Sequence, residues 1–254
     1  MKPSFVICGI EHSGTTLLSD IFRQVPTIDS GFETGVLLVD SPREFRSLDP
    51  FISNIVSGWG VKDTELDMIC DCDTFDEFYD RLWQQSTVVN HQKTIMFDKT
   101  PRYFSTLNSC TQKIDCPFIA TYKDPRAIVA SDFRRDKAEN FSVWFDSYAP
   151  RKKKYLRIIY AQLEQTVQGS IPNAIAVSLE AVCLDTRQTL EKMFAHVGQE
   201  FDLSYLLLKN LRYHHTKLPY ISSNIPFQYL EVFNKSQIKQ IEKRFEEFEL
   251  FFYQ

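Results

Sequence analysis

The chain has 254 residues with a formal net charge of −4, and 43% of its residues are hydrophobic. This length and composition fit one α/β domain over residues 1–254, and the acidic balance argues against a nucleic-acid partner. No apolar run reaches the roughly 18 residues of a membrane span, and the apolar N-terminal stretch is followed too soon by charge to be a secretory signal. We therefore expect a cytoplasmic protein without a membrane span.

The first 25 residues carry the strongest local signal. An apolar run over residues 4–10 predicts a buried strand, and the polar turn after it holds Gly14 and opens into an amphipathic helix. Helix N-termini expose unpaired N–H groups with partial positive charge, so a strand, turn and helix in this order predict an anion site. Loops that bind nucleoside triphosphates need a lysine, but Thr15 stands in its place although Gly9 and Gly14 have the right spacing. The loop is therefore predicted to hold a phosphate, but not that of ATP.

The rest of the chain alternates between short strands and amphipathic helices. Residues 36–92 form a long insertion, which we expect to be a cap on the acceptor side, with its acidic residues between 63 and 80 in solvent. Further strands are predicted at 94–98, 117–123 and 174–179, and a late helix begins after Asn234. The short apolar strands favour a parallel sheet covered on both faces, a three-layer α/β sandwich. The six cysteines are expected to be reduced, and their spacing predicts no metal site.

A second anion site is predicted between residues 123 and 135. Lys123 ends a strand, Asp124 is suited to cap the following helix, and Pro125 occupies its first position. Ser131 and Arg135 are four residues apart and therefore share one face of that helix. Ligands of open α/β sheets bind at the carboxyl ends of strands, so this ammonium, hydroxyl and guanidinium predict a second phosphate site.

Three segments together resemble the sulfotransferases that use 3′-phosphoadenosine 5′-phosphosulfate (PAPS) as sulfuryl donor, most closely the bacterial and tyrosylprotein-type branch. Residues 11–17 (EHSGTTL) are similar to the family's 5′-phosphosulfate loop, usually R/K-S-G-T-T. Residues 123–135 resemble its 3′-phosphate motif, and residues 98–101 (DKTP) resemble its E-K-T-P element. The resemblance covers most of the chain and implies a P-loop-like fold, PAPS as donor, PAP as product and no metal. It assigns donor binding to His12, Ser13, Gly14, Thr15, Thr16, Leu17, Lys123, Ser131, Arg135 and, from a looser match, Ser223.

The resemblance also indicates the residues of catalysis. Attack of a hydroxyl on sulfur builds negative charge on the leaving and sulfuryl oxygens, and Lys99 is expected to supply a cation there. Glu33 is the leading candidate for the general base, because glycines on both sides suggest an exposed turn and because the tyrosylprotein-type branch has a glutamate base at a comparable distance from the loop. The weaker candidates are two carboxylates and the histidines that a second branch would use: Glu11, Glu44, His91, His214 and His215.

His12 departs from the family pattern, which usually has arginine or lysine at this position. The ordinary pKa of histidine is about 6.5, so its charge depends on its surroundings. Adjacent phosphoryl and sulfuryl charges favour the imidazolium form. We therefore predict that His12 takes part in catalysis and binds the sulfuryl group as a cation or proton donor.

Three functions remain open at this level. The first is sulfuryl transfer to the hydroxyl of a small molecule, lipid or glycan, with a tyrosyl acceptor also allowed. The second is an inactive protein that binds PAPS or PAP, and the third is a P-loop nucleotide kinase, which would need the missing lysine and a magnesium-binding carboxylate. If the acidic insertion lines the acceptor site, the acceptor is not strongly anionic. The sequence allows a homodimer.

Overall fold

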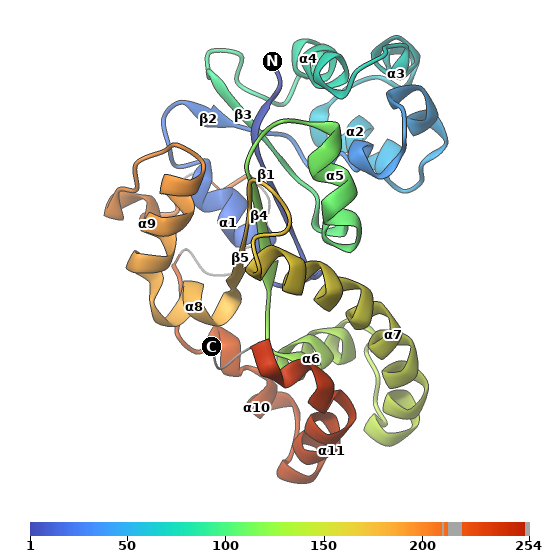
Figure 1. The fold of residues 1–254 in the computed structure, drawn as a ribbon, viewed down its shortest axis with the longest axis vertical. Helices are drawn as coiled ribbons and strands as arrows, with labels where there is room; N and C mark the ends of the chain where they lie inside the picture. The colour runs from blue at the N-terminus through green and yellow to red at the C-terminus, as the bar shows by residue number, and fades with distance from the viewer. Residues whose placement is uncertain (210, 213–219, 252–254) are drawn as a thin grey trace.

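The computed structural model describes residues 1–209, 211–212 and 220–251 of the chain, and Figure 1 shows their arrangement. Within these residues, five parallel strands form one sheet in the order β2-β3-β1-β4-β5. The strands are β1 (Pro3–Gly9), β2 (Ile28–Asp29), β3 (Ile95–Lys99), β4 (Phe118–Tyr122) and β5 (Ala174–Ser178). The four strands predicted from the sequence are confirmed to within a residue or two. The prediction missed β2, because two residues are too few to show a pattern.

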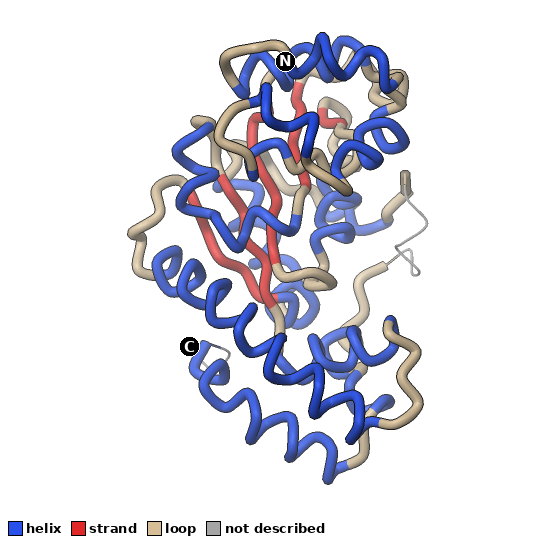
Figure 2. Tube along the Cα trace, turned by 90° about the vertical axis from the view of Figure 1, so that its right-hand side faces the viewer, coloured by secondary structure: helices blue, strands red, loops and turns tan. Residues whose placement is uncertain are grey.

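Helices cover both faces of the sheet, which confirms the predicted sandwich. Alternate residues of β1 point to opposite faces: Phe5 and Ile7 pack with α1 (Thr15–Phe22), α8 (Leu179–Leu184) and α9 (Thr186–His196). Val6 and Cys8 pack on the other face with α5 (Leu107–Lys113) and α7 (Phe141–Val167). In Figure 1 the strands β1, β4 and β5 lie between these two groups of helices, and Figure 2, turned by 90°, shows the strands side by side.

The remaining helices extend the molecule at its two ends (Figure 1). Next to the N-terminus lie α2 (Phe51–Trp59), α3 (Asp63–Cys70) and α4 (Phe75–Gln85), all from the predicted insertion. At the opposite end lie α6 (Pro125–Arg135), α10 (Tyr229–Val232) and α11 (Lys235–Phe245). The predicted cap of α11 is confirmed, since Asn234 and Gln237 exchange hydrogen bonds of 2.9 and 3.0 Å. Among the described residues, none of the helices combines the length and apolar character needed for a membrane span.

The acidic residues of the insertion are paired on its surface. Arg46 binds the carboxylates of Asp63 and Asp67 at 2.9 Å each, and Arg43 reaches Asp71 and Asp73 at 3.3 and 3.1 Å. The apolar face of α4 is buried, as the sequence predicts, through Phe75, Phe78, Tyr79, Leu82 and Trp83. All six cysteines are buried and free.

The sheet order brings three loops to one place. Strand β1 lies in the middle, with β3 and β4 hydrogen-bonded to its two sides, so that Ile7 pairs with Lys99 and Gly9 pairs with Thr121. The loops that follow these three strands therefore leave the same edge of the sheet, where ligands of open α/β sheets bind.

Candidate active site

The loop between β1 and α1 is held by Ser13 and shaped by Gly14. The buried Ser13 hydroxyl donates to the Ile10 carbonyl oxygen at 2.6 Å and lies 2.6 Å from the Thr121 hydroxyl on β4. Gly14 has a φ of +89°, and a Cβ there would lie 2.7 Å from Leu179 Cδ1, so a side chain does not fit. The first turn of α1 starts at Thr15, and its N–H groups have no helical partner.

The hydrogen-bond donors of Ser13 are both used within the protein. Its N–H donates to the Ile10 carbonyl at 3.0 Å and its hydroxyl is also bonded within the protein, so neither donor is free for a ligand. We therefore expect Ser13 to shape the loop. By contrast, the four residues after it line a cavity: Gly14, Thr15, Thr16 and Leu17.

The second predicted anion site is assembled as the sequence indicates. The ammonium of Lys123, which is 3% exposed, donates to the Ser131 hydroxyl at 2.7 Å. Within the described part of the chain, no carboxylate forms an ion pair with Lys123, and burial lowers its pKa to about 7. Lys123, Ser131 and His12 line a small cavity of about 90 Å³, and Arg135 at the end of α6 lies next to it.

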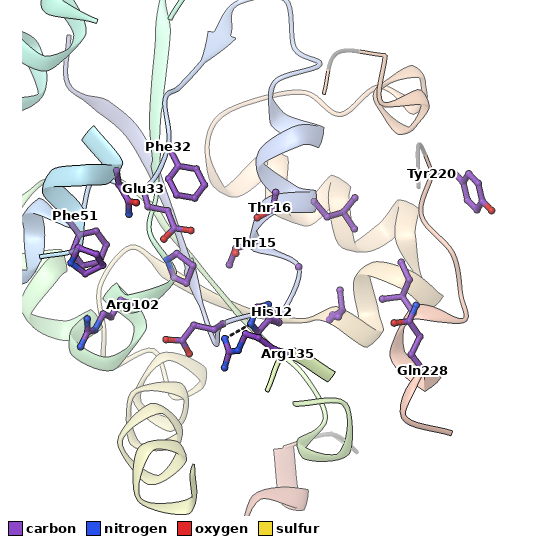
Figure 3. Close-up of a pocket in the computed structure, with 18 residues that line it drawn as sticks. His12, Thr15, Thr16, Phe32, Glu33, Phe51, Arg102, Arg135, Tyr220 and Gln228 are labelled. Carbon is purple, nitrogen blue, oxygen red and sulfur yellow. Dashed lines mark hydrogen bonds between the residues drawn. The ribbon is translucent and has the colours of Figure 1, made fainter. Parts of the chain in front are cut away.

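His12 joins the two anion sites through a contact with Arg135, drawn as a dashed line in Figure 3. Arg135 Nη1 lies 2.7 Å from His12 Nε2, and because arginine has only donors, this ring nitrogen accepts. The imidazole is therefore neutral in the ligand-free chain. Its pKa is lowered below the ordinary value by desolvation of the ring and then by the positive charges of Lys123 and Arg135.

The predicted cation and the predicted base form an ion pair. Lys99 ends β3, is 1% exposed, and places its Nζ 2.5 Å from Glu33 Oε1 and 4.5 Å from the centre of the Phe32 ring. Burial lowers the pKa of Lys99, and the carboxylate of Glu33 opposes that effect. In Figure 3, Glu33 extends from below Phe32 toward Thr15 at the start of α1.

A buried carboxylate that the sequence did not single out holds the loop of Glu33. Asp98 is 0% exposed, and its carboxylate accepts hydrogen bonds of 2.6–3.0 Å from four hydroxyls: Thr34, Tyr79, Tyr103 and Thr100. Thr34 follows Glu33 directly, so Asp98 ties the base's loop to the end of β3. In the sequence, Asp98 could have been recognised from its place at the carboxyl end of a buried strand, next to Lys99.

A cavity of about 670 Å³ is lined by His12, Glu33, Arg135 and the start of α1, whereas Lys99 and Asp98 are not among its lining residues. Its first half is lined by the anion loop, by which we mean His12 and residues 14–17, and by Arg135, Leu179, Tyr220, Ile225 and Gln228. Its second half, which we call the acceptor half, is lined by Phe32, Glu33, Pro50, Phe51, Asn54, Pro101 and Arg102. Glu11 also lines the cavity, and its carboxylate accepts from the Tyr155 hydroxyl at 2.8 Å.

A family model described as the sulfotransferase family matches residues 3–203. The chain belongs to the sulfotransferase family. Comparison of its sequence with curated proteins found no match. The family assignment therefore rests on the family model.

Solved sulfotransferases share the fold of this sulfotransferase over nearly its whole length. The sulfotransferase domain of the Synechococcus PCC 7002 olefin synthase is 15% identical with a TM-score of 0.65, covering 97% of this chain and 94% of that domain. The domain from the curacin biosynthetic pathway is 15% identical with a TM-score of 0.61, over 97% and 98% of the two chains. Mouse sulfotransferase SULT7A1, solved with PAP, is 12% identical with a TM-score of 0.56, over 97% and 84%.

Some residues considered from the sequence lie outside the cavity of this sulfotransferase. Ser223 is exposed and does not line the cavity, although Ile225 and Gln228 do. Among the weaker base candidates, Glu44 is exposed on the insertion, and His91 contacts the Ser86 carbonyl at 2.9 Å. His214 and His215 lie outside the described residues. The sequence did not predict Arg102, Phe51 and Asn54 as cavity residues, because no motif marks the acceptor side.

Proposed function

We propose that this sulfotransferase transfers the sulfuryl group of PAPS to a hydroxyl group of a small-molecule, lipid or glycan acceptor. The observation that carries the proposal is a cavity that joins the loop after β1 and Arg135 to Glu33, whose carboxylate is paired with Lys99. The presence of PAP in the mouse structure supports PAPS as the donor. PAPS supplies the sulfuryl group and leaves as PAP.

The donor side has separate places for two phosphate groups. The start of α1, opened by Gly14, suits the 5′-phosphosulfate, and Lys123 with Ser131 and Arg135 suits the 3′-phosphate. A bound phosphate would restore the full charge of Lys123, which has no carboxylate partner among the described residues. Thr15 stands where loops that bind nucleoside triphosphates have a lysine, which favours PAPS over such a triphosphate as the ligand.

Glu33 is the proposed general base. It takes the proton of the acceptor hydroxyl while the hydroxyl oxygen bonds to sulfur and the bond from sulfur to the bridging phosphate oxygen breaks. Lys99 has three N–H donors, so it has donors left for a sulfuryl oxygen while it holds Glu33. His12 is neutral in the ligand-free chain, and the charge of the bound anion favours the protonated form that stabilises the leaving oxygen.

Replacement of the base tests the proposal. Glu33→Gln keeps the side-chain shape but removes the proton acceptor, so we expect kcat to fall by about 10²- to 10⁴-fold. Transfer of ³⁵S from PAPS to phenols, sugars and lipid head groups measures this loss. PAP binding, followed by its effect on thermal unfolding, should stay as in the wild type.

Glu11→Gln is the matched control, because Glu11 also lines the cavity. Loss of transfer in this variant and not in Glu33→Gln would make Glu11 the base. Stabilisation by PAP without transfer to any acceptor would indicate a binding protein, and stabilisation by ATP alone would indicate a nucleotide kinase. The cytoplasmic location and the homodimer considered from the sequence stay predictions.

A further inference from the structure

The acceptor half of the cavity contains a guanidinium without a protein partner among the described residues. Arg102 is exposed, lines the cavity and lies three residues after Lys99, in the 3₁₀ helix Pro101–Thr106 that follows β3. Within the described ranges, its guanidinium makes no ion pair or hydrogen bond. By contrast, Arg46 and Arg126 each bind two carboxylates. Arg102 is therefore a charge that a ligand in the cavity can pair with.

The apolar walls beside Arg102 are held in place by close packing. A Cβ on Gly58 would lie 2.2 Å from Phe32 Cβ, and a Cβ on Gly35 would lie 2.2 Å from Phe51 Cγ. Trp59 Nε1 also donates to the Phe32 carbonyl at 2.6 Å. Because each phenylalanine sits directly against a glycine, these walls are preformed. They suit an apolar body of about the size of a ring.

The charges around this half of the cavity favour a ligand with one negative charge. The carboxylate of Glu33 is taken by Lys99, and that of Glu11 accepts from Tyr155, but both border the same cavity and would repel a dianion. One guanidinium has a planar pair of donors that matches the two oxygens of a carboxylate. The acidic residues of the insertion do not line the cavity, so they do not exclude a carboxylate there.

We propose that Arg102 forms an anion subsite for the acceptor, which carries a carboxylate on an apolar, ring-sized body. The body lies between Phe32 and Phe51, the hydroxyl reaches Glu33, and the carboxylate pairs with Arg102. Figure 3 shows Phe51, Arg102 and Glu33 on the same side of the cavity, away from Tyr220 and Gln228. This inference rests on the proposed function, because it assumes that the acceptor occupies this half.

The test compares compounds that differ only in the carboxylate. Isothermal titration of the protein saturated with PAP measures binding of 3-(4-hydroxyphenyl)propionate and of 4-propylphenol, with no turnover. For the wild type we expect about tenfold tighter binding of the carboxylate compound, the size of a well-oriented charge-assisted hydrogen bond at a partly exposed site. Arg102→Gln should bring the ratio close to one. Arg187→Gln, which changes an exposed arginine paired with Glu191 on α9, should leave the tenfold ratio intact.

Each outcome supports or overturns the inference. Equal binding of the two compounds by the wild type, a ratio that persists in Arg102→Gln, or no binding of either compound would overturn it. The titration with PAP that precedes these measurements reports on the proposed function separately. Failure to bind PAP would refute the donor assignment, whereas PAP binding without a preference for the carboxylate would refute the Arg102 subsite alone.

Discussion

At the scale of single residues, the proposed role of Lys123 predicts that donor binding depends on pH. Burial lowers its pKa to about 7 in the ligand-free chain, and a bound phosphate raises it again. Below pH 7 the ammonium is charged before and after binding, so this residue adds no pH dependence. Above pH 7 binding must take up a proton, and we expect the affinity for PAP to fall roughly tenfold between pH 7 and 8.5, measured by calorimetry.

Lys123→Arg separates this effect from other titrations. Arginine stays charged throughout this range, so the variant should show a nearly flat profile above pH 7. The phosphates of PAP are already ionised there and contribute little. His12→Gln removes any proton that His12 takes up together with the anion, and the fall that Lys123 causes should remain in this variant. A flat wild-type profile would contradict the assignment of Lys123 to the donor site.

At the scale of elements, the end of β3 holds the loop of Glu33, the proposed base, through hydroxyl groups. Thr34 donates to Asp98 Oδ2 at 2.6 Å from the loop that carries Glu33, and Tyr79 donates to the same oxygen at 2.6 Å from α4. Thr34→Val removes the loop's hydrogen bond at nearly constant volume. We expect it to cost about 1–3 kcal/mol of folding stability and to lower kcat by about tenfold, with PAP affinity unchanged.

Tyr79→Phe removes a hydrogen bond to the same carboxylate from a different element. Its cost in the free energy of unfolding should be similar, but its kcat should change much less, since α4 does not carry Glu33. Thermal unfolding and steady-state transfer rates measure both quantities. Equal losses of kcat in the two variants would show that the Asp98 cluster contributes stability without positioning the base.

These elements also show how far the sequence could predict the site. Lys123, Ser131 and Arg135 were predicted to act together because one strand end and one helix face hold them, which is a local property. The contact of Lys99 with Glu33 spans 66 residues and follows from the pairing of β2, which precedes Glu33, with β3, which no local pattern contains. The same holds for Arg102 and Phe51, whose place in one cavity depends on the packing of the insertion.

At the scale of the whole molecule, the donor side is completed by chain beyond the family match. That match ends at residue 203, yet Ile225 and Gln228 line both cavities of the donor side. The segment that carries them is anchored on α6 and α7 by Phe233, whose ring centre lies 5.4 Å from that of Phe133 and 5.2 Å from that of Phe141. The stability of this packing should therefore be coupled to donor binding.

Phe233→Leu tests this coupling, with Phe78→Leu as the matched control. Both rings are almost fully buried, but Phe78 lies in the insertion and packs against Phe45 at 5.3 Å. Each change should cost about 1–2 kcal/mol of the free energy of unfolding, because a smaller side chain leaves space in a packed core. At a temperature well below both midpoints, only Phe233→Leu should weaken PAP binding, by roughly three- to tenfold, since it loosens the segment that holds Ile225 and Gln228. Equal PAP affinities in the two variants would mean that the C-terminal segment covers the donor side without contributing to binding.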